Sequence, residues 1–196
     1  MNQTILFIDG ENFINKIEEV LKNKNIRKNQ IDITSLNFKK LFAKPLQDFK
    51  VSRKIFYAAK LHYHPDTEDK SAKLIKAQRK LRNNLINQKF EFTMAGNVRA
   101  QEIRINNKTK IIFREKGVDV KIAVDLVSLS ADKVIKTAIL CSSDSDLQPA
   151  VQEVRKRNVE VIYLGFEINP NKGLSYTTNR TILFRDSEIL ESCGMK

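Results

Sequence analysis

Two aspartates follow strongly apolar runs and are the first candidates for chemistry. Asp9 comes directly after the run 5–8, and Asp144 follows the run 138–141 after two serines. Continuous apolar runs are typical of buried strands in a parallel sheet, and open parallel sheets bind ligands at the carboxyl ends of their strands. We therefore expect Asp9 and Asp144 to line a site. The alternative is that each acid only caps the helix that follows it.

A third candidate lies on a helix predicted from residue 118 to residue 130. At about 100° per residue, Lys121 and Asp125 share a polar stripe, whereas Asp119 falls on the apolar side. A carboxylate that faces the core is costly unless it is paired or bound to a cation; the alternative is a capping or dipole role in the first turn. We expect Asp119 to join the site, and Asp125 to be solvated or to support the site indirectly.

A fourth acid, Asp146, follows two residues after Asp144. Pro149 has no N–H and must lie in the first turn of its helix, so the N-cap is Asp146 or a later residue. Asp146 is therefore either a helix cap or a further acid of the site. Asp144 is expected to lie outside the helix, where its side chain can point into the site.

Acids that gather at one sheet edge repel one another and need a counter-charge. Carboxylates without His or Cys select hard cations such as Mg²⁺ or Mn²⁺. Such an ion activates a water and stabilises the leaving oxygen when a phosphodiester is cleaved. We expect Asp9, Asp119 and Asp144 to be the metal ligands and Asp146 to be a fourth catalytic acid.

The elements that must position these acids alternate along the chain. Strands are predicted at residues 4–8, 51–59, 90–94, 137–141, 160–165 and 181–184. Helices are predicted at residues 11–24, 35–44, 65–88 and 118–130, and before residue 157. The alternating segment 98–115, with Asn106 and Asn107 at its tip, predicts a basic β-hairpin or arm. This order predicts one α/β domain over residues 1–196, a three-layer α/β/α sandwich with a mainly parallel sheet.

The charge of the chain indicates a polyanionic partner. Its 196 residues carry 35 Lys and Arg against 23 Asp and Glu, which gives a net charge of +12. Cations crowd the helix 70–82 and the arm 99–116, where they predict a phosphate-binding rim; the alternative is an ordinary solvated face. We expect substrate contacts from five residues: Asn12, Ser142, Lys116, Arg99 and Arg104.

Several classes of protein are disfavoured. Neither GxxxxGK[ST] nor GxGxxG occurs, which argues against the usual nucleotide hydrolases and dinucleotide-binding proteins. Two cysteines make no disulfide framework and favour a reducing, cytoplasmic setting. No segment has the ~18 apolar residues that a membrane-spanning helix needs, so we expect no membrane association.

Four segments in order resemble the NYN domain family of PIN-like ribonucleases: residues 7–12 (FIDGEN), 116–126 (KGVDVKIAVDL), 140–147 (LCSSDSDL) and 158–165 (NVEVIYLG). The resemblance implies a PIN-like fold and a divalent-metal site with Asp9, Asp119, Asp144 and Asp146 as its acids. It also implies that Asn12 is the polar residue that completes the first motif. Homodimers are common in the family, so the resemblance also implies a homodimer as one assembly. The chain has Ser143 where the family usually has glycine, and Asp125 recurs in the family pattern.

We therefore predict a metal-dependent ribonuclease, an endonuclease that uses Mg²⁺ or Mn²⁺ to cleave single-stranded or structured RNA. The alternative is an RNA-binding module with the same fold and no catalysis. A phospho-acceptor or phosphatase domain is disfavoured because Glu11, not Asp, follows two residues after Asp9.

Overall fold

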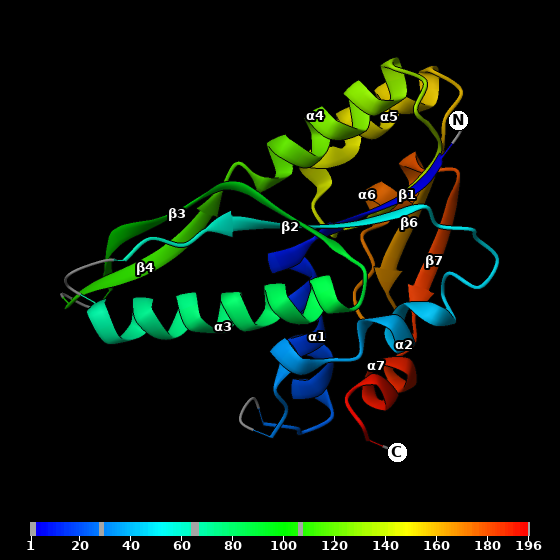
Figure 1. Ribbon diagram of the computed structural model, residues 1–196. Coiled ribbons are helices and arrows are strands. Elements are labelled where there is room, and N and C mark those ends of the chain that lie inside the picture. The colour runs from blue at the N-terminus through cyan, green and yellow to red at the C-terminus, as the bar shows by residue number, and fades with distance from the viewer. Residues whose placement is uncertain (1–2, 28–29, 64–66, 106–107, 196) are drawn as a thin grey trace.

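The computed structural model describes residues 3–27, 30–63, 67–105 and 108–195, and for residues 100, 102–105 and 108–110 it describes the backbone only. Figure 1 shows a curled sheet with helices on both faces. Its strands are β1 (Gln3–Asp9), β2 (Arg53–Lys60), β3 (Glu91–Ile105), β4 (Lys108–Lys116), β5 (Ile135–Cys141), β6 (Glu160–Phe166) and β7 (Arg180–Phe184). The α-helices are α1 (Gly10–Asn23), α2 (Phe38–Ala43), α3 (Glu68–Asn87), α4 (Val118–Ala131), α5 (Gln148–Lys156), α6 (Lys172–Thr177) and α7 (Asp186–Ser192), with 3₁₀ turns η1 (Ile33–Ser35) and η3 (Ser145–Leu147).

The seven strands form one sheet in the order β4-β3-β2-β1-β5-β6-β7. β1 lies at the centre and pairs in parallel with β2 and β5, and the pairs β2–β3, β5–β6 and β6–β7 are parallel as well. β3 and β4 pair antiparallel. The predicted α/β class and mainly parallel sheet are therefore confirmed. The carboxyl ends of β1 and β5 meet at one edge, as the sequence predicted.

Each face of the sheet carries its own hydrophobic core. Leu6 and Ile8 of β1 pack with residues of α1, α2 and α7, whereas Ile5 and Phe7 pack with residues of α4, α5 and α6. All four side chains are fully buried. Side chains alternate between the two faces of a strand, so burial on both faces explains why this strand reads as a continuous apolar run.

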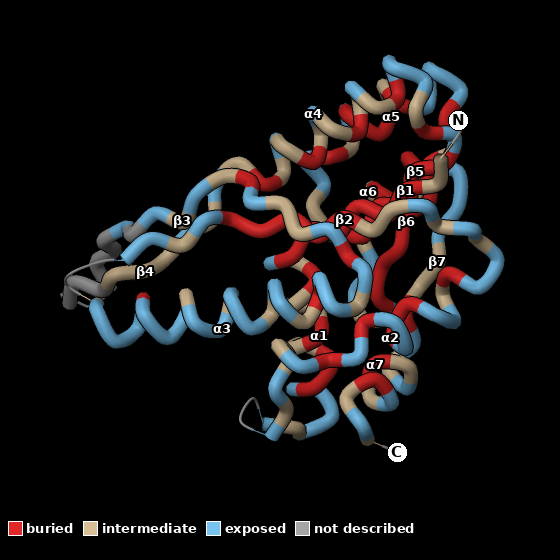
Figure 2. Tube along the Cα trace, in the orientation of Figure 1, coloured by how far each residue is buried: buried red, intermediate tan, exposed pale blue. Residues whose placement is uncertain are grey.

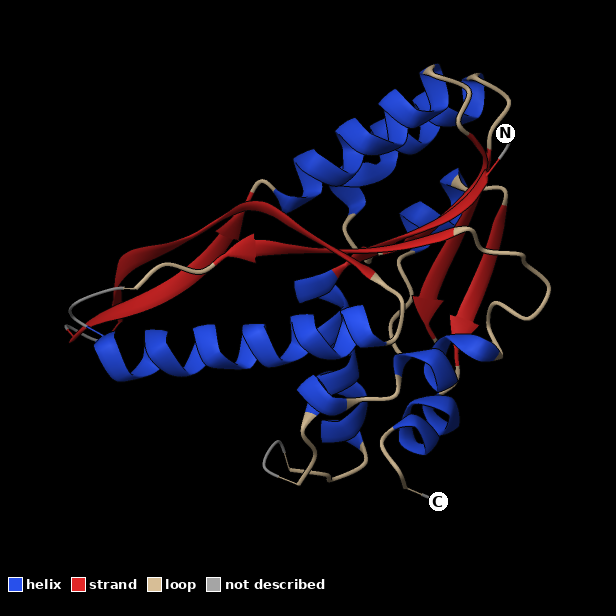
Figure 3. Ribbon diagram, in the orientation of Figure 1, coloured by secondary structure: helices blue, strands red, loops and turns tan. Residues whose placement is uncertain are grey.

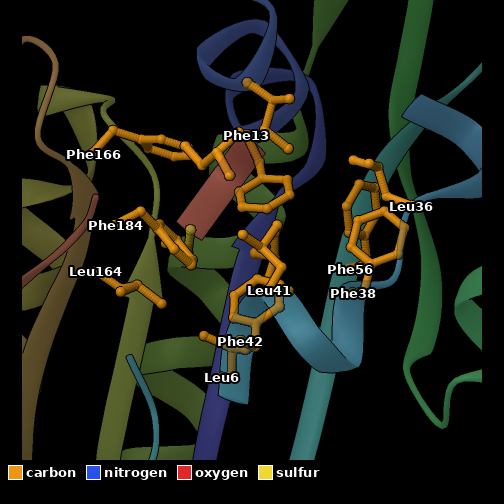
Figure 4. Packing of buried hydrophobic residues seen from close by; sticks show 14 of the residues in the cluster. Leu6, Phe13, Leu36, Phe38, Leu41, Phe42, Phe56, Leu164, Phe166 and Phe184 are labelled. Carbon is orange, nitrogen blue, oxygen red and sulfur yellow. The ribbon is translucent and has the colours of Figure 1, made fainter. Parts of the chain in front are cut away.

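An aromatic cluster fills the core under α1 (Figure 4). Phe13 lies at its centre, with ring centroids 5.5 Å from Phe42, 5.6 Å from Phe166 and 6.0 Å from Phe184. These distances are in the range where aromatic pairs attract beyond simple burial. The cluster therefore fixes α1, whose first residue follows Asp9, against the sheet.

β3 is longer than the sequence predicted. Its first part pairs with β2 and its second part, from Asn97, pairs with β4. Between them Gly96 adopts φ +73, and a Cβ there would meet the Lys116 carbonyl oxygen at 2.1 Å. The sequence predicted two separate elements here, a strand at 90–94 and an arm from residue 98. Glycine instead permits a bend within one continuous strand. Figure 3 shows the β3–β4 ribbon extending beside α3.

That the β3–β4 ribbon is a basic insertion stays a prediction. The expected tip, Asn106 and Asn107, lies outside the described residues, and so do the side chains of Arg104, Lys108 and Lys110. Among the residues that the structure describes, no helix is long and apolar enough to cross a membrane.

The aromatic cluster predicts the cost of losing its central ring. Phe13→Ala should lower the free energy of unfolding by about 3–5 kcal/mol, because it removes a fully buried ring and leaves a cavity. Urea unfolding measures this change. The control is Tyr176→Ala, which removes a ring that is 91% exposed and should change stability by less than about 0.5 kcal/mol. Equal losses of stability in the two variants would contradict the assignment of Phe13 to the centre of the core.

Candidate active site

Asp9 is a buried carboxylate at the carboxyl end of the central strand. Its Oδ1 accepts a hydrogen bond from the backbone N–H of Asn12 at 3.2 Å, which makes Asp9 the N-cap of α1. Its Oδ2 accepts from the Ser142 hydroxyl at 3.0 Å. The two readings of Asp9 are therefore compatible, because one oxygen caps the helix while the other ties β1 to the loop after β5.

The loop after β5 is held by a chain of hydrogen bonds. The Asn12 side-chain oxygen accepts from the Ser143 N–H at 2.9 Å, and the Ser142 hydroxyl accepts from the Asp144 N–H at 3.1 Å. Asp144 in turn accepts from the Asp146 N–H at 2.9 Å, as the N-cap of η3. Asp144 lies outside α5, at the predicted position, and it also caps the 3₁₀ turn that precedes α5, as the capping alternative proposed. Asp146 is exposed and does not cap α5.

Asp119 approaches the same edge of the sheet from α4. It lies in the first turn of α4, which begins directly after Gly117. Gly117 has φ +91, a conformation that side chains other than glycine rarely adopt. This residue lets the chain turn from the end of β4 into α4, so that the first turn of α4 faces the ends of β1 and β5.

A cleft of about 510 Å³ is lined by Asp9, Asn12, Asp119 and Asp144 together with their neighbours. Five carboxylates contribute to its wall, and Lys116 is the one cation among the lining residues that the structure describes. The five are Asp9, Glu11, Glu115, Asp119 and Asp144. Three of the four sequence-predicted acids thus share the cleft, and Asp146 is not among its lining residues.

Two carboxyl groups of the cleft have raised pKa values, mainly because they are buried. Burial raises the pKa of Asp9 to about 6, against the hydrogen bonds from Asn12 and Ser142, which lower it. Burial also raises the pKa of Glu115 to about 8, and the nearby charges of Glu11 and Asp9 add to this shift. Perturbed acids in a cleft are a recognised mark of functional sites. A cation placed in the cleft would favour the charged form of both carboxyl groups and so lower both pKa values.

The site contains two acids that the sequence analysis did not assign. Glu115 ends the alternating arm, and its Oε2 accepts from the Ala59 N–H at 3.3 Å. Glu11 follows Asp9 closely and lines the cleft beside Glu115. Glu115 immediately precedes the motif that begins at Lys116, a position that could have identified it. The reading of 98–115 as an arm placed it outside the site.

Asp125 was expected to be either solvated or an indirect support of the site, and the structure places it in a half-buried contact that fits the second alternative. It accepts from the Tyr57 hydroxyl at 2.9 Å and from the Lys121 ammonium at 2.5 Å. Tyr57 is fully buried in β2, and its burial, with the charge of Asp125, raises its pKa. This contact anchors α4 to the sheet, so Asp125 supports the placement of Asp119 without lining the cleft.

The predicted substrate contacts are brought together only in part. Asn12 and Lys116 line the cleft, and Ser142 is buried and reaches it through Asp9. Arg99 is exposed and is not among the lining residues. The side chain of Arg104 lies outside the part of the chain that the structure describes.

The lining carboxylates do not converge on one point. Among the described residues, no group of three His, Cys, Asp or Glu side chains is placed to hold a metal ion. The described residues that line the cleft nevertheless present oxygen donors and include no His or Cys, the donor set that suits Mg²⁺ or Mn²⁺. The chemistry of the donors therefore fits a hard divalent cation.

The fold and the cleft define an α/β domain with acids at the carboxyl edge of a mainly parallel sheet. The sequence profile of the NYN domain matches residues 3–183. The chain therefore belongs to the NYN domain family, a family of PIN-like ribonucleases. The resemblance seen in the sequence is confirmed.

A solved structure shares the fold. It is a protein of unknown function from Vibrio parahaemolyticus RIMD 2210633, with a TM-score of 0.58 and 17% identity, and the match covers 93% of this chain and 92% of that one. At this identity the likeness concerns the fold alone. No curated protein matches the chain.

The raised pKa of Asp9 predicts a pH-dependent stability difference. A carboxyl that binds its proton more tightly when folded makes stability fall as pH rises from about 4 to about 6. Asp9→Asn removes the buried charge. In EDTA near pH 8 it should therefore raise the free energy of unfolding by about 1–3 kcal/mol. The gain should vanish below about pH 3, where Asp9 is protonated in both the folded and the unfolded state.

Denaturant unfolding of both proteins across this range measures the difference. Asp9→Asn also removes one cause of the raised Glu115 pKa, so relief of Glu115 adds to the gain near pH 8. A gain that is the same at all pH values would contradict the burial of a charged Asp9.

Asn171 holds the late loop from the side of α6. Its Nδ2 donates to the Ser143 carbonyl at 2.8 Å, while its Oδ1 caps α6 by accepting from the Leu174 N–H at 2.8 Å. Asn171→Asp keeps the cap but places an oxygen against the Ser143 carbonyl. It should lower the free energy of unfolding by about 1–3 kcal/mol.

The control for this variant is Asn37→Asp. Asn37 caps α2 through the Lys40 N–H at 2.9 Å and lies on the other face of the sheet. Aspartate caps helices as well as asparagine does, so this variant should be nearly neutral. Equal effects in the two variants would show that Asn171 only caps α6.

Proposed function

We propose that this chain is a divalent-metal-dependent ribonuclease that cleaves RNA phosphodiester bonds. The observation that carries the proposal is the acidic cleft at the ends of β1, β4 and β5, in a chain of the NYN family. Mutually repelling carboxylates are expensive to hold together without a counter-ion. A binding site for Mg²⁺ or Mn²⁺ accounts for their presence.

Asp9, Asp119 and Asp144 are the proposed ligands of the ion. When bound, the ion supplies a Lewis acid that activates a water and stabilises the leaving oxygen. The Asn12 N–H and the Ser142 hydroxyl orient the Asp9 carboxylate, so these two residues act by positioning a ligand. This fixed orientation matters because a displaced ligand weakens metal binding.

The remaining roles concern RNA. Lys116 lines the cleft and is placed to attract a phosphate. Six exposed cations on α3 supply a wider electrostatic field for a polyanion: Lys70, Lys73, Lys76, Arg79, Lys80 and Arg82. Asp146, exposed on η3, is assigned to a supporting role at the mouth of the site rather than to the cleft wall.

An RNA-binding module without catalysis is the second candidate. It is favoured by one observation, that no three described carboxylates are placed to hold an ion. Ser143, in the place of the usual family glycine, restricts the loop that carries Asp144. On this reading, the cations bind RNA and the acids are remnants of a lost site.

Cleavage of a labelled RNA pool with Mn²⁺, Mg²⁺ or EDTA tests the proposal. Wild type should cleave with metal and not with EDTA. Asp9→Asn and Asp119→Asn should each reduce the rate by about a hundredfold or more. Cleavage of a circular RNA would establish an endonuclease, because a circle has no end.

The matched control is Asp132→Asn. Asp132 is the exposed C-cap of α4, the same helix that carries Asp119 in its first turn. It should leave the rate unchanged. Full activity in both site variants would contradict the proposed mechanism. RNA binding without cleavage under any metal would favour the second candidate.

A further inference from the structure

A second hollow is bounded by α1, α3 and the strands β2, β3 and β4. It has a volume of about 670 Å³, and its walls are mainly apolar. Figure 1 shows α3 running alongside the β3–β4 ribbon, and Figure 2 shows most of α3 exposed. We call this hollow the α3 groove. Its apolar wall includes Phe56, Leu74, Ala77, Leu81, Val98 and Ile111.

The charged residues that line the α3 groove are mainly acidic. Three of them are the carboxylates Glu11, Glu18 and Glu115, and Lys70 is the one cation among the lining residues that the structure describes. The Lys70 ammonium lies over the Phe113 ring, 4.9 Å from its centre. The groove is therefore locally acidic in a chain whose net charge is +12.

The other cations of α3 do not line the groove. The stripe of α3 that faces it includes Lys70, Leu74, Ala77 and Leu81, whose spacings of three and four residues define one face of a helix. The remaining cations are exposed and fall outside this stripe: Lys73, Lys76, Arg79, Lys80 and Arg82. The glutamates therefore set the local charge of the groove.

Two of these glutamates lie where the groove meets the acidic cleft. Glu11 and Glu115 line both hollows, and neither is a proposed ligand of the metal ion. In the described part of the chain, no ion pair joins either side chain to a cation. Neighbouring carboxylates repel each other, and a cation placed between them removes the repulsion. The inner end of the groove is therefore suited to a positively charged group.

One wall of the groove is the edge strand of the sheet. β4 is the last strand in the sheet order, and its residues Ile111, Ile112, Phe113 and Glu115 line the groove. An edge strand leaves one side of its backbone without a neighbouring strand. Extended peptides add to such edges through main-chain hydrogen bonds, while their alternate side chains enter adjacent pockets. The groove therefore suits an extended chain.

We propose that the α3 groove docks an extended basic segment of a partner protein, in which Lys or Arg alternates with apolar side chains. The apolar side chains pack on the α3 stripe, and the cations face Glu11, Glu18 and Glu115. Acidic peptides and nucleic acids are disfavoured, because these three carboxylates repel carboxylates and phosphates alike. The proposal concerns binding alone and does not depend on the proposed ribonuclease activity.

A short labelled peptide in which leucine and lysine alternate is the probe. Its binding is measured by fluorescence anisotropy in EDTA, which keeps divalent ions out of the neighbouring cleft. Wild type should bind it at least about tenfold more tightly than peptides with glutamate in place of lysine or with serine in place of leucine. No binding, tighter binding of the glutamate peptide, or equal binding of the serine peptide would each overturn the proposal.

Glu115→Gln tests the charge of the groove. Glutamine keeps an oxygen that can accept from the Ala59 N–H, as Glu115 does at 3.3 Å, so the local fold should be retained. This variant should bind the leucine–lysine peptide about tenfold more weakly.

Two variants that remove one charge elsewhere are the controls. Glu167→Gln changes an exposed position outside the groove, and Asp119→Asn changes the acidic cleft but not the groove. Both should bind the peptide as wild type does. An equal loss in Glu167→Gln would indicate attraction to the chain as a whole, and an equal loss in Asp119→Asn would place the peptide in the cleft. Either result would overturn the proposal.

A second pair of variants tests the groove by its shape. Ala77→Leu adds volume inside the groove, whereas Ala72→Leu adds the same volume to an exposed position of α3 that does not line it. Leucine is a good helix former, so both variants should fold. We expect weaker binding of the leucine–lysine peptide in Ala77→Leu only.

The outcomes separate this proposal from the proposed function. Peptide binding in EDTA needs no cleavage, so a chain without nuclease activity can still show it. Wild-type peptide binding in both Glu115→Gln and Ala77→Leu would overturn the groove proposal and leave the ribonuclease proposal untouched.

Discussion

A carboxylate buried at the end of the central strand is the constraint on which this structure depends. Asp9 is only 6% exposed, yet it must accept the N–H that starts α1 and the hydroxyl that holds the loop after β5. Its burial favours the protonated acid, whereas both hydrogen bonds favour the charged form. Without a cation, the buried charge of Asp9 therefore lowers the stability of the fold. Natural proteins accept such a loss of stability mainly at functional positions.

The other acids reach Asp9 through features that are far apart in sequence. Gly117 turns the chain from β4 into α4, and the Tyr57–Asp125 hydrogen bond holds α4 against β2. The aromatic cluster around Phe13 fixes α1 on the opposite face. Two hydrophobic cores thus hold the cleft from both sides of the sheet, so the positions of its acids follow from packing that is independent of any ligand.

Much of this arrangement could be predicted from local sequence signals. Apolar runs located the strands, and the rule for parallel sheets placed Asp9 and Asp144 at one edge. Helical periodicity separated Asp119 from Asp125, and the cleft contains only the former. These inferences need only the residues near each acid, which explains why they agree with the structure.

The parts that could not be predicted depend on distant partners. The sequence left Asp125 as either a solvated acid or an indirect support of the site, because Tyr57, its partner, is 68 positions away. Glu115 looked like part of an arm because its contact with the Ala59 N–H joins separate strands. The short helix α6 has weak periodicity, and its cap, Asn171, gains importance only from its contact with the Ser143 carbonyl.

The most direct test of this account is to locate Mn²⁺ in crystals by anomalous X-ray scattering. The account predicts a manganese peak in the acidic cleft, in contact with Asp9 and with Asp119 or Asp144, and no such peak in crystals of Asp9→Asn. An empty cleft at saturating Mn²⁺, or a peak bound elsewhere in a protein that still cleaves RNA, would contradict the assignment of these acids to a metal site.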